Sequence, residues 1–419
     1  MDKLKKIVFQ YKYEFLLILI SLIFIKSLSY LLQLDIQSII YLDSGSYYES
    51  AENVYYYYRG HNLRPMVLAL IHGIPFLFTN SAMEVYANTY YINLFCWIGS
   101  TLLIYKIAQH YISDKKAFFL SLLNLIIIGN VISVFHMLSE NIFIFFIVLA
   151  FYFYHLFRTK SKTLYLALFL SVVVISMLIR PGAKFFAVFI LLFFIKDIIK
   201  YYKIKSFYLL YFSFFLVFIQ CAGIKYQFGN FTISYIDSVT YYNYLGSKAM
   251  CYKNDVDYSQ FNNQRGKYLF SLGYEESKVE VFKDMKNQLK GNKINLLKAY
   301  TDDLYENSTT GNIILNDVVN IKSTSYFESI KSNLYNFTIY SNVFLTITGL
   351  LLSLFTLLLL YKDKFVVIIS AFISYTFLTS GVSCGQGDRF HIVFFPFILL
   401  LLAINIQYFS SKKRSKLFV

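Results

Sequence analysis

Residues 139–179 read SENIFIFFIVLAFYFYHLFRTKSKTLYLALFLSVVVISMLI, two apolar stretches joined by a short basic connection. Each stretch approaches the roughly 20 residues that an α-helix needs to cross a hydrocarbon core of about 30 Å. The cations between them, Arg158, Lys160 and Lys162, are typical of a cytoplasmic loop. The segment therefore predicts two membrane-crossing helices joined on the cytoplasmic side.

The same pattern recurs along the chain and predicts an all-α polytopic membrane protein with about ten transmembrane helices. With 57% hydrophobic residues and a mean hydropathy of +0.52, the 419 residues lack the composition of a soluble globule. The expected helices cover residues 14–32, 88–109, 117–134, 139–157, 163–179, 183–199, 206–224, 337–361, 364–381 and 390–408.

The net charge of +15 lies in connections that would share one face of the membrane. They carry 20 Lys or Arg against five Asp or Glu, an excess that equals the charge of the whole chain. Because cytoplasmic loops hold the Lys/Arg excess, we expect both termini in the cytoplasm of a bacterium and a multi-pass protein in its cytoplasmic membrane. The charge then faces membrane lipids, and nucleic acid is not an expected partner.

Three parts of the chain follow from this topology. Residues 1–224 form an N-terminal transmembrane module that includes a first outer loop, 33–86. Residues 225–336 form an extracytoplasmic segment with 13 basic and 12 acidic residues, and residues 337–419 form the C-terminal helices and a basic cytoplasmic tail.

Both outer parts are expected to contain helices. In the first loop, the apolar stretch 63–78 is too short to span and is interrupted by prolines, so it predicts an interfacial or re-entrant helix. In the large segment, residues 275–299 predict an amphipathic helix with Gly291 as a weak point. The four cysteines show no metal-type spacing; Cys251 and Cys384 could pair, although unpaired cysteines are the simpler expectation.

Charged residues stand at several helix ends on the predicted outer face. Charges at the ends of apolar helices are costly to desolvate and usually face a cavity or a partner. Because these residues are far apart in sequence but share one face, they predict a site. The candidates are Asp43, Tyr47 and Arg64 in the first loop, Glu140 at the fourth helix, Arg180 after the fifth, and Arg389 and His391 before the last.

Each charged candidate also has an ordinary explanation. Asp43 can be a loop acid, and Arg180 can be a cation that reaches the lipid headgroups. Glu140 can be a first-turn acid that interacts with the helix dipole, with Ser139 as the N-cap. The histidines His72 and His136 fit structural positions.

The order of these features resembles the membrane-integral GT-C glycosyltransferases, especially the branch of protein O-mannosyltransferases and lipid A aminoarabinose transferases. The similarity covers about 33–200 and, less closely, 380–400. In the first loop, Asp43-Ser44 stands where many members have paired acids, which weakens the case for a bound metal. The matching residues are Asp43-Ser-Gly-Ser-Tyr47, Arg64-Pro65, Ser139-Glu140-Asn141, Arg180-Pro181-Gly182 and Asp388-Arg389-Phe390-His391 with Pro396.

The resemblance implies transfer of a sugar from a polyprenyl-phosphate donor at the outer face, with inversion at the anomeric carbon. Asp43 would be the general base toward an acceptor hydroxyl, and Glu140 would position the acceptor or hold a cation. Tyr47 and Arg64 would support the acceptor and the loop. The acceptor could be a glycan, a lipid or a protein.

The same resemblance implies that arginines bind the donor phosphate. Guanidinium groups suit this role because they form bidentate charge-assisted hydrogen bonds, and Arg180 and Arg389 are assigned to it with His391 as a weaker candidate. No cofactor is certain; a divalent metal is left open, and no metal ligands are assigned.

Two other functions remain open from the sequence. An O-antigen or capsule repeat-unit polymerase also has about ten helices and a large outer loop, but it would use arginines in that loop, and residues 225–336 contain only Arg265. A polytopic transporter or flippase would need charged or helix-breaking residues near the middle of the membrane, which most of the expected spans lack.

Overall fold

The chain is all-helical: helices account for 79% of it, and no strand occurs among the described residues. The computed structural model describes residues 10–34 and 41–416. Short 3-10 turns are marked η, and η5 is a π-helix. The helices are α2 (Lys12–Leu32), α3 (Leu42–Tyr56), α4 (Met66–His72), η1 (Ile74–Leu77), α5 (Ala82–Ala108), α6 (Asp114–Leu122), α7 (Ile128–Ile132), η2 (Ser133–Phe135), α8 (Glu140–Lys160), α9 (Thr163–Ser176), η3 (Pro181–Ala183), α10 (Lys184–Phe193), α11 (Ile195–Tyr201), η4 (Lys205–Phe207), α12 (Tyr208–Phe228), α13 (Ile236–Thr240), η5 (Tyr241–Leu245), α14 (Gly246–Lys253), α15 (Gln264–Ser271), α16 (Tyr274–Gly291), α17 (Lys293–Thr309), η6 (Ile313–Asp317), α18 (Phe327–Leu360), α19 (Lys364–Ser380), η7 (Gly387–Arg389), η8 (His391–Val393) and α20 (Phe395–Lys416).

Six helices in the described part of the chain are long and apolar enough to cross a membrane, which indicates a membrane protein. They are α2, α5, α8, α12 with the preceding η4, α18 and α20. Three shorter apolar helices, α9, η3–α10 and α19, lie among them. At about 1.5 Å per residue, the 34 residues of α18 extend over roughly 50 Å, more than a hydrocarbon core requires.

The expected count of ten spans is not confirmed, because the stretch 117–134 does not form one helix. It is divided into α6, a turn, α7 and η2. In the turn, the side chain of Asn124 donates to Oγ1 of Thr101 on α5 at 2.8 Å, a contact with a neighbouring helix. Further on, Gly129 is packed against the side chains of Asp388 and Asn312, where a Cβ would be too close. Tertiary contacts thus accompany the break in a stretch that is apolar enough for a helix.

The connection between α2 and α5 contains short helices, as expected. The apolar stretch predicted over 63–78 is α4 followed by η1. Pro65 is the N-cap of α4, where its missing N–H costs no helical hydrogen bond, and Gly73 ends the helix. Before α4, α3 places Asp43 in its first turn.

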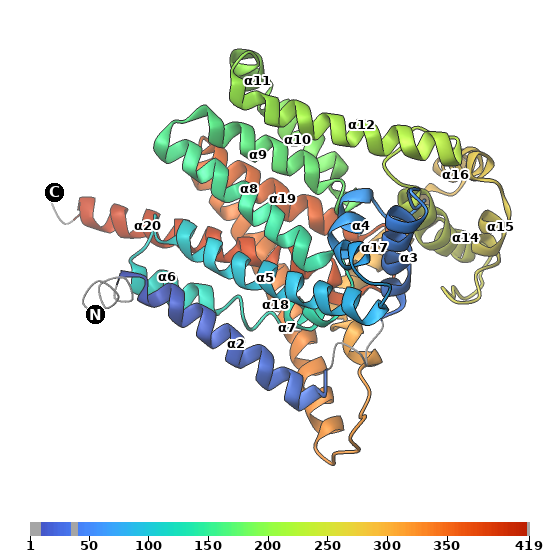
Figure 1. Ribbon diagram of the computed structural model, residues 1–419, viewed down its shortest axis with the longest axis horizontal. Coiled ribbons are helices and arrows are strands. Elements are labelled where there is room, and N and C mark those ends of the chain that lie inside the picture. Colours follow the sequence, from blue (N-terminus) through green and yellow to red (C-terminus); the bar gives the residue numbers. More distant parts are fainter. Residues whose placement is uncertain (1–9, 35–40, 417–419) are drawn as a thin grey trace.

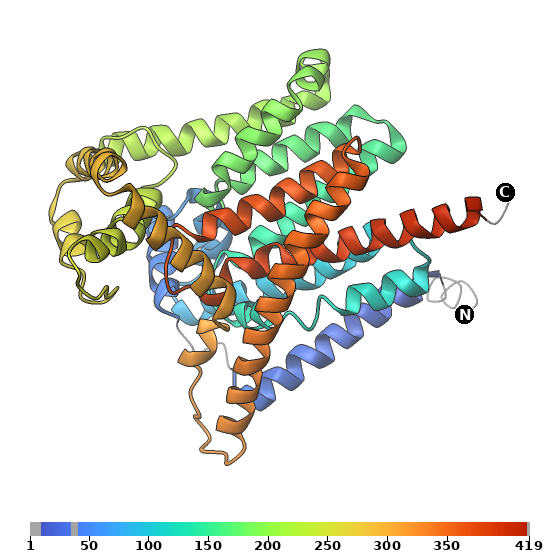
Figure 2. The ribbon, with the colours of Figure 1, turned by 180° about the vertical axis from the view of Figure 1, so that it is seen from behind.

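The segment 225–336 lies at the end of the bundle far from both ends of the chain (Figures 1 and 2). The single helix expected over 275–299 is instead two helices, α16 and α17. The break falls at Asn292, directly after Gly291, the residue that the sequence marks as weak. Helix α17 packs against α14, α18, α19 and η7, so this segment is joined to the membrane helices.

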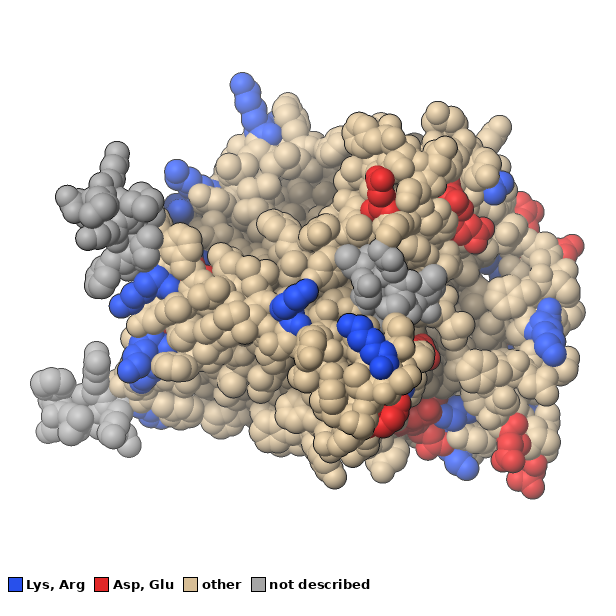
Figure 3. Space-filling view, turned by 60° about the horizontal axis from the view of Figure 1, so that its bottom comes forward, with Lys and Arg blue, Asp and Glu red and all other residues tan. Residues whose placement is uncertain are grey.

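The basic connections predicted to share one side do meet at one end of the bundle, which we call the basic end. Lys106 pairs with Glu14, an ion pair that joins α5 to α2. Figure 3 shows Lys and Arg at this end and most of the visible acids toward the other end. The cations counted at residues 3–6 lie outside the described residues. All four cysteines are unpaired.

Two further ion pairs complete the basic end. Arg158 pairs with Asp363 at 2.8 Å, and Lys364 pairs with Asp197 at 3.1 Å. They connect α8, α11 and the start of α19. The opposite end, which we call the site end, holds the candidate residues.

Candidate functional site

Five charged residues from five separate segments converge at the site end: Asp43, Arg64, Glu140, Arg180 and Arg389. Asp43 is in α3, Arg64 precedes α4, Glu140 is the first residue of α8, Arg180 lies between α9 and η3, and Arg389 ends η7. All five were predicted as site residues, and we call them the arginine–carboxylate cluster.

Arg389 lies at the centre of the cluster. Its Nε and Nη2 atoms lie 3.0 and 2.8 Å from Oε1 of Glu140. Its Nη1 atom donates to Oδ2 of Asp43 at 2.9 Å and to the hydroxyl of Tyr41 at 3.3 Å. The Arg389 and Glu140 side chains are 7% and 1% exposed, so this contact is buried. A buried ion pair needs such complete hydrogen bonding to offset the cost of desolvation.

Asp43 is the most exposed member of the cluster, with 38% of its side chain accessible. Its Oδ1 atom accepts from Arg64 at 3.1 Å, and its Oδ2 atom accepts from Arg389. Burial alone would raise the pKa of Asp43, but Arg389 and Arg64 offset this effect and lower the pKa below its ordinary value. Asp43 is therefore an ionised carboxylate that solvent can reach.

Arg64 is held by the first turns of α3. Its Nε atom donates to the hydroxyl of Ser46 at 2.8 Å, and its Nη1 atom donates to the hydroxyl of Tyr47 at 3.1 Å. Its guanidinium also lies 4.1 Å from the centre of the Tyr47 ring. Arg64 thus holds Asp43, and Ser46 and Tyr47 hold Arg64. The supporting role of Tyr47 and Arg64 toward an acceptor stays a prediction.

Arg180 is attached less tightly than the other arginines. Its Nη1 atom lies 4.0 Å from Oε1 of Glu140 and has no hydrogen-bond partner, although the atom is buried. The rings of Phe390 and Phe143 lie 5.1 and 5.8 Å from its guanidinium. Oε2 of Glu140 also has no partner. Because buried polar atoms normally have hydrogen-bond partners, these two atoms are available to a ligand.

The turn before Arg389 depends on two glycines. Gly385 and Gly387 have φ values of 63° and 53°, a backbone conformation that residues other than glycine rarely adopt. A Cβ at Gly387 would also collide with the carbonyl oxygen of Gly311. The turn can therefore approach the segment 225–336 closely only with glycine at this position.

Two asparagines of that segment fix the turn. Oδ1 of Asn307 accepts from the amide of Gln386 at 3.0 Å, and its Nδ2 atom donates to the carbonyls of Ser380 and Ser383 at 2.9 and 2.6 Å. Asn312 donates to Oδ1 of Asp388 at 2.8 Å. Neither residue was predicted to take part in the site: Asn307 stands in an Asn-x-Thr sequon, which is expected by chance in an Asn-rich chain, and Asn312 belongs to no motif.

Asp388 faces away from the cluster and is only 3% exposed. Burial raises its pKa to about 7, against the lowering effects of Asn312 and Arg389. The side chain of the next residue, Arg389, contacts Asp43 and Glu140 instead. The two adjacent charged side chains therefore have different partners.

The structure does not support the prediction that His391 binds phosphate. Its Nδ1 atom lies 2.9 Å from the hydroxyl of Thr346 and 3.1 Å from Oδ1 of Asn342. Its Nε2 atom lies 3.1 Å from the hydroxyl of Ser380. The ring is fully buried, and burial lowers its pKa to about 3, so it is a neutral group that joins α18, α19 and η8.

Another histidine, His136, which the sequence analysis assigned to a structural position, lies near the cluster. It is 1% exposed, and neither ring nitrogen has a hydrogen-bond partner. Its ring is 6.3 Å from that of Tyr41, and Asn93 donates to its carbonyl at 2.9 Å. Burial, followed by the charge of Arg389, lowers its pKa to about 3. The sequence signal for this placement was that His136 stands only four residues before Glu140.

The cluster carries three arginines and two carboxylates, so one positive charge is in excess. Both carboxylates are already paired with arginines. Among residues 10–34 and 41–416, no three His, Cys, Asp or Glu side chains are close enough to hold a metal ion together. The geometry therefore favours an anionic ligand.

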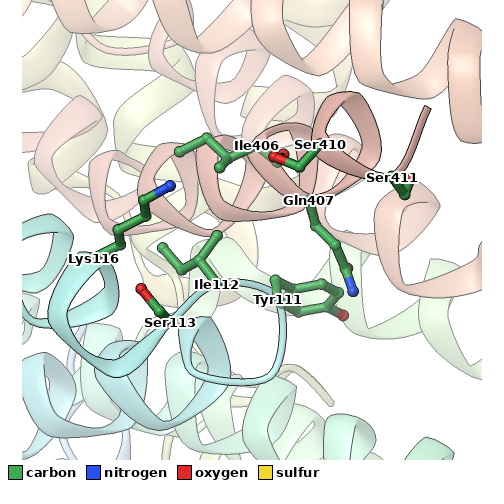
Figure 4. A pocket seen from close by; sticks show the side chains of 8 residues that line it. All are labelled: Tyr111, Ile112, Ser113, Lys116, Ile406, Gln407, Ser410 and Ser411. Carbon is green, nitrogen blue, oxygen red and sulfur yellow. The ribbon is translucent and has the colours of Figure 1, made fainter. Parts of the chain in front are cut away.

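Two surface cavities lie at the basic end instead. One, of about 600 Å³, is lined by Tyr111, Ser113 and Lys116 on one side and by Gln407 and Ser410 of α20 on the other (Figure 4). The second, of about 680 Å³, surrounds the Arg158–Asp363 pair. Neither contacts the arginine–carboxylate cluster, so we treat them as separate from the candidate site.

Comparisons with known proteins do not assign the chain to a family. No protein-family model matches the chain, and neither a curated protein nor a solved structure is detectably similar to it. The functional interpretation therefore depends on the residues of the site.

Proposed function

We propose that the chain is a GT-C-type glycosyltransferase of the bacterial cytoplasmic membrane, with both termini in the cytoplasm and the site end outside. It would transfer a sugar from a polyprenyl-phosphate donor to an acceptor hydroxyl. The observation that carries the proposal is the arginine–carboxylate cluster, in which an accessible ionised Asp43 lies among three arginines with one positive charge in excess. Such a site suits a substrate with a hydroxyl and a phosphate.

Asp43 would act on the acceptor. The acceptor oxygen attacks the anomeric carbon as the bond from that carbon to the phosphate oxygen breaks, and Asp43 takes the proton of the hydroxyl. A carboxylate with a lowered pKa is a weak base, so the proton would move late, when the hydroxyl has become acidic. A single displacement without a covalent intermediate inverts the anomeric carbon.

Arg180 is the best candidate for the donor phosphate, which gains negative charge as it leaves. Its Nη1 atom is unpartnered at the cluster, and a guanidinium forms strong hydrogen bonds with phosphate oxygens. The sequence assigned Arg389 the same role, but each of its nitrogens already lies within 3.0 Å of a carboxylate oxygen. We therefore assign Arg389 to positioning Asp43 and Glu140.

The segment 225–336 supports this assignment, because it holds the turn that carries Arg389.

The single arginine of this segment, Arg265, pairs with Asp284 at 2.8 Å and lies 4.3 Å from the centre of the Tyr242 ring. A polymerase would need arginines of this loop to bind its substrate, and Arg265 is already paired with Asp284. The segment therefore does not favour the polymerase. The prenyl chain of the donor would lie between lipid and the membrane helices.

The test is photo-crosslinking of the purified protein in lipid nanodiscs with a polyprenyl-phosphate sugar that carries a photoreactive group beside the phosphate. The proposal expects labelled peptides that contain Arg180 or Arg64, and transfer of one sugar to an acceptor hydroxyl. Labelling restricted to the basic end, or movement of the lipid across the membrane without sugar transfer, would overturn it. A product with many repeat units would indicate the polymerase.

A further inference from the structure

Helix α16 lies across the end of a membrane-spanning helix. In Figures 1 and 2, α12 runs lengthwise through the view, whereas α16, at its far end, is seen close to end-on. A helix in this orientation runs along a membrane surface if α12 crosses the membrane. Its 18 residues correspond to a length of roughly 27 Å.

The first turns of α16 are fixed to α12 and its following loop. The rings of Tyr274 and Phe228 are 4.8 Å apart. The side chain of Glu275 packs over Gly229, where a Cβ would collide with it. One turn later, the ammonium of Lys278 lies 5.2 Å from the centre of the Tyr235 ring. Glu275 and Lys278 therefore mark the face of α16 that is directed at the membrane helices.

The same face continues along α16. Residues spaced three, four and seven apart share a face of an α-helix, so Phe282 and Leu289 follow Lys278 on it. Their exposed fractions are 64% and 54%.

The covered face of α16 is a different one. Val281 and Gln288 are 8% and 2% exposed, and Nε2 of Gln288 donates to the carbonyl of Gly246 at 3.0 Å. Asp284 accepts from Tyr241 at 3.2 Å on the same side. The helix thus packs against the rest of segment 225–336 with one face and leaves Phe282 and Leu289 uncovered.

Charges are also divided between the faces of α16. Lys278, Lys286 and Lys290 stand on the side of Phe282 and Leu289, whereas Glu276, Glu280 and Asp284 follow one another at intervals of four on another side. Lysines beside exposed apolar residues are typical of helices that lie in the headgroup region. There, the apolar side chains enter the acyl boundary and the ammonium groups meet lipid phosphates.

We infer that the Phe282–Leu289 face of α16 binds the surface of the bilayer at the site end, with Lys286 and Lys290 in contact with lipid phosphates. The partner is the lipid surface, because this face continues the one that meets the end of a membrane helix. The inference is independent of the proposed enzymatic function. It explains how a segment outside the membrane can hold the Arg389 turn at a constant depth.

The test uses the full-length protein with Cys251 replaced by serine. The other three cysteines are buried, so a single introduced cysteine can be labelled with the fluorophore NBD. The variants are Phe282→Cys and Leu289→Cys, with Glu280→Cys as the matched control on the acidic side of the same helix. Each is placed in nanodiscs that contain phosphatidylglycerol, with or without lipids that carry a nitroxide near the headgroup.

We expect blue-shifted NBD emission and at least twofold quenching by the nitroxide lipids at positions 282 and 289, and little quenching at 280. Replacing phosphatidylglycerol with phosphatidylcholine should reduce the difference. Equal quenching at 282 and 280, or stronger quenching at 282 by aqueous iodide than by nitroxide lipid, would overturn the inference. So would protection at 282 that appears only when two copies share a nanodisc, because a second copy would then cover the face.

Discussion

The two ends of the helix bundle use charge in different ways. At the basic end, pairs such as Arg158–Asp363 join neighbouring helices one to one, and their side chains are 33% and 26% exposed. At the site end, Arg389 contacts two carboxylates at once, and the Arg389–Glu140 contact is almost fully buried. Exposed pairs contribute roughly 0–1 kcal/mol, whereas a buried charge is costly without a partner.

This difference indicates what each end is for. The charges of the basic end can be explained by topology and by the lipid surface, since solvent and headgroups reach them. The cluster at the site end has no such explanation, because apolar helices alone would be cheaper to pack there. Costly charges that persist in a membrane protein usually serve a ligand, and substitutions at the two ends should therefore differ in kind.

The largest effect is expected at Asp43. Asp43→Asn keeps the size of the side chain and removes the proton acceptor, so transfer should fall by about 10²–10⁴-fold. Because Asp43 is partly exposed, the melting temperature should change little. The measurement is turnover of the purified variant with a polyprenyl-phosphate sugar. Asp237→Asn is the control, an exposed acid that pairs with Lys184 outside the cluster; similar turnover of the two variants would contradict the assignment.

The second effect tests the comparison directly. Glu140→Gln leaves Arg389 and Arg180 close together with one carboxylate fewer, and loss of one partner of a buried ion pair typically costs about 3–5 kcal/mol. The matched change at the basic end, Asp363→Asn, should cost at most about 1 kcal/mol. Unfolding by SDS in mixed micelles measures both. Equal losses would show that the two ends do not differ energetically.

The sequence placed the five charged residues of the cluster on one face, together with His391, which is not part of the cluster; the reason is topological. Alternating spans fix the end at which each connection lies, so Asp43, Glu140, Arg180 and Arg389 could be grouped without knowing any distance. Helix type followed from apolar length, and the bounds of α8 lie within three residues of those expected. Other bounds differ more: α5 begins at Ala82 instead of 88, and α18 begins at Phe327 instead of 337. Their roles in a reaction stay predictions, because grouping does not identify a substrate.

The pairing inside the cluster could not be predicted in the same way. Whether Arg389 or Arg180 keeps a free nitrogen depends on side-chain geometry that no sequence spacing encodes. Asn307 and Asn312 were missed because an asparagine that binds backbone groups or a carboxylate distant in sequence has no characteristic spacing. The break in 117–134 was missed because Asn124 and Gly129 respond to partners on α5 and beside α20, which are distant in sequence.

A third effect depends on pH. Asp388 has a pKa of about 7 in the folded chain, against about 3.9 for a free side chain. Between these values the folded state holds a proton that the unfolded state has released, so stability falls as pH rises from about 4 to 7. Asp388→Asn should abolish this loss, with a gain of up to roughly 4 kcal/mol at pH 8 and none at pH 4. Melting curves of the variant and the parent protein at both pH values measure this gain. An equal gain in stability at pH 4 and pH 8 would show that titration of Asp388 is not its cause.

The smallest effect distinguishes the role of Arg180 from that of Arg389. Arg180→Lys keeps the charge but removes the planar fork that binds two phosphate oxygens, so the affinity for the donor should fall about tenfold, with little loss of stability. Arg389→Lys should do the reverse, because a single ammonium cannot satisfy both Asp43 and Glu140. Donor binding and melting temperature are measured on both variants, with Lys364→Arg at the basic end as a control that should change neither. If Arg389→Lys weakens donor binding while its melting temperature stays unchanged, Arg389 is the phosphate ligand, as the sequence first indicated, and its contacts with the two carboxylates must open when the donor binds.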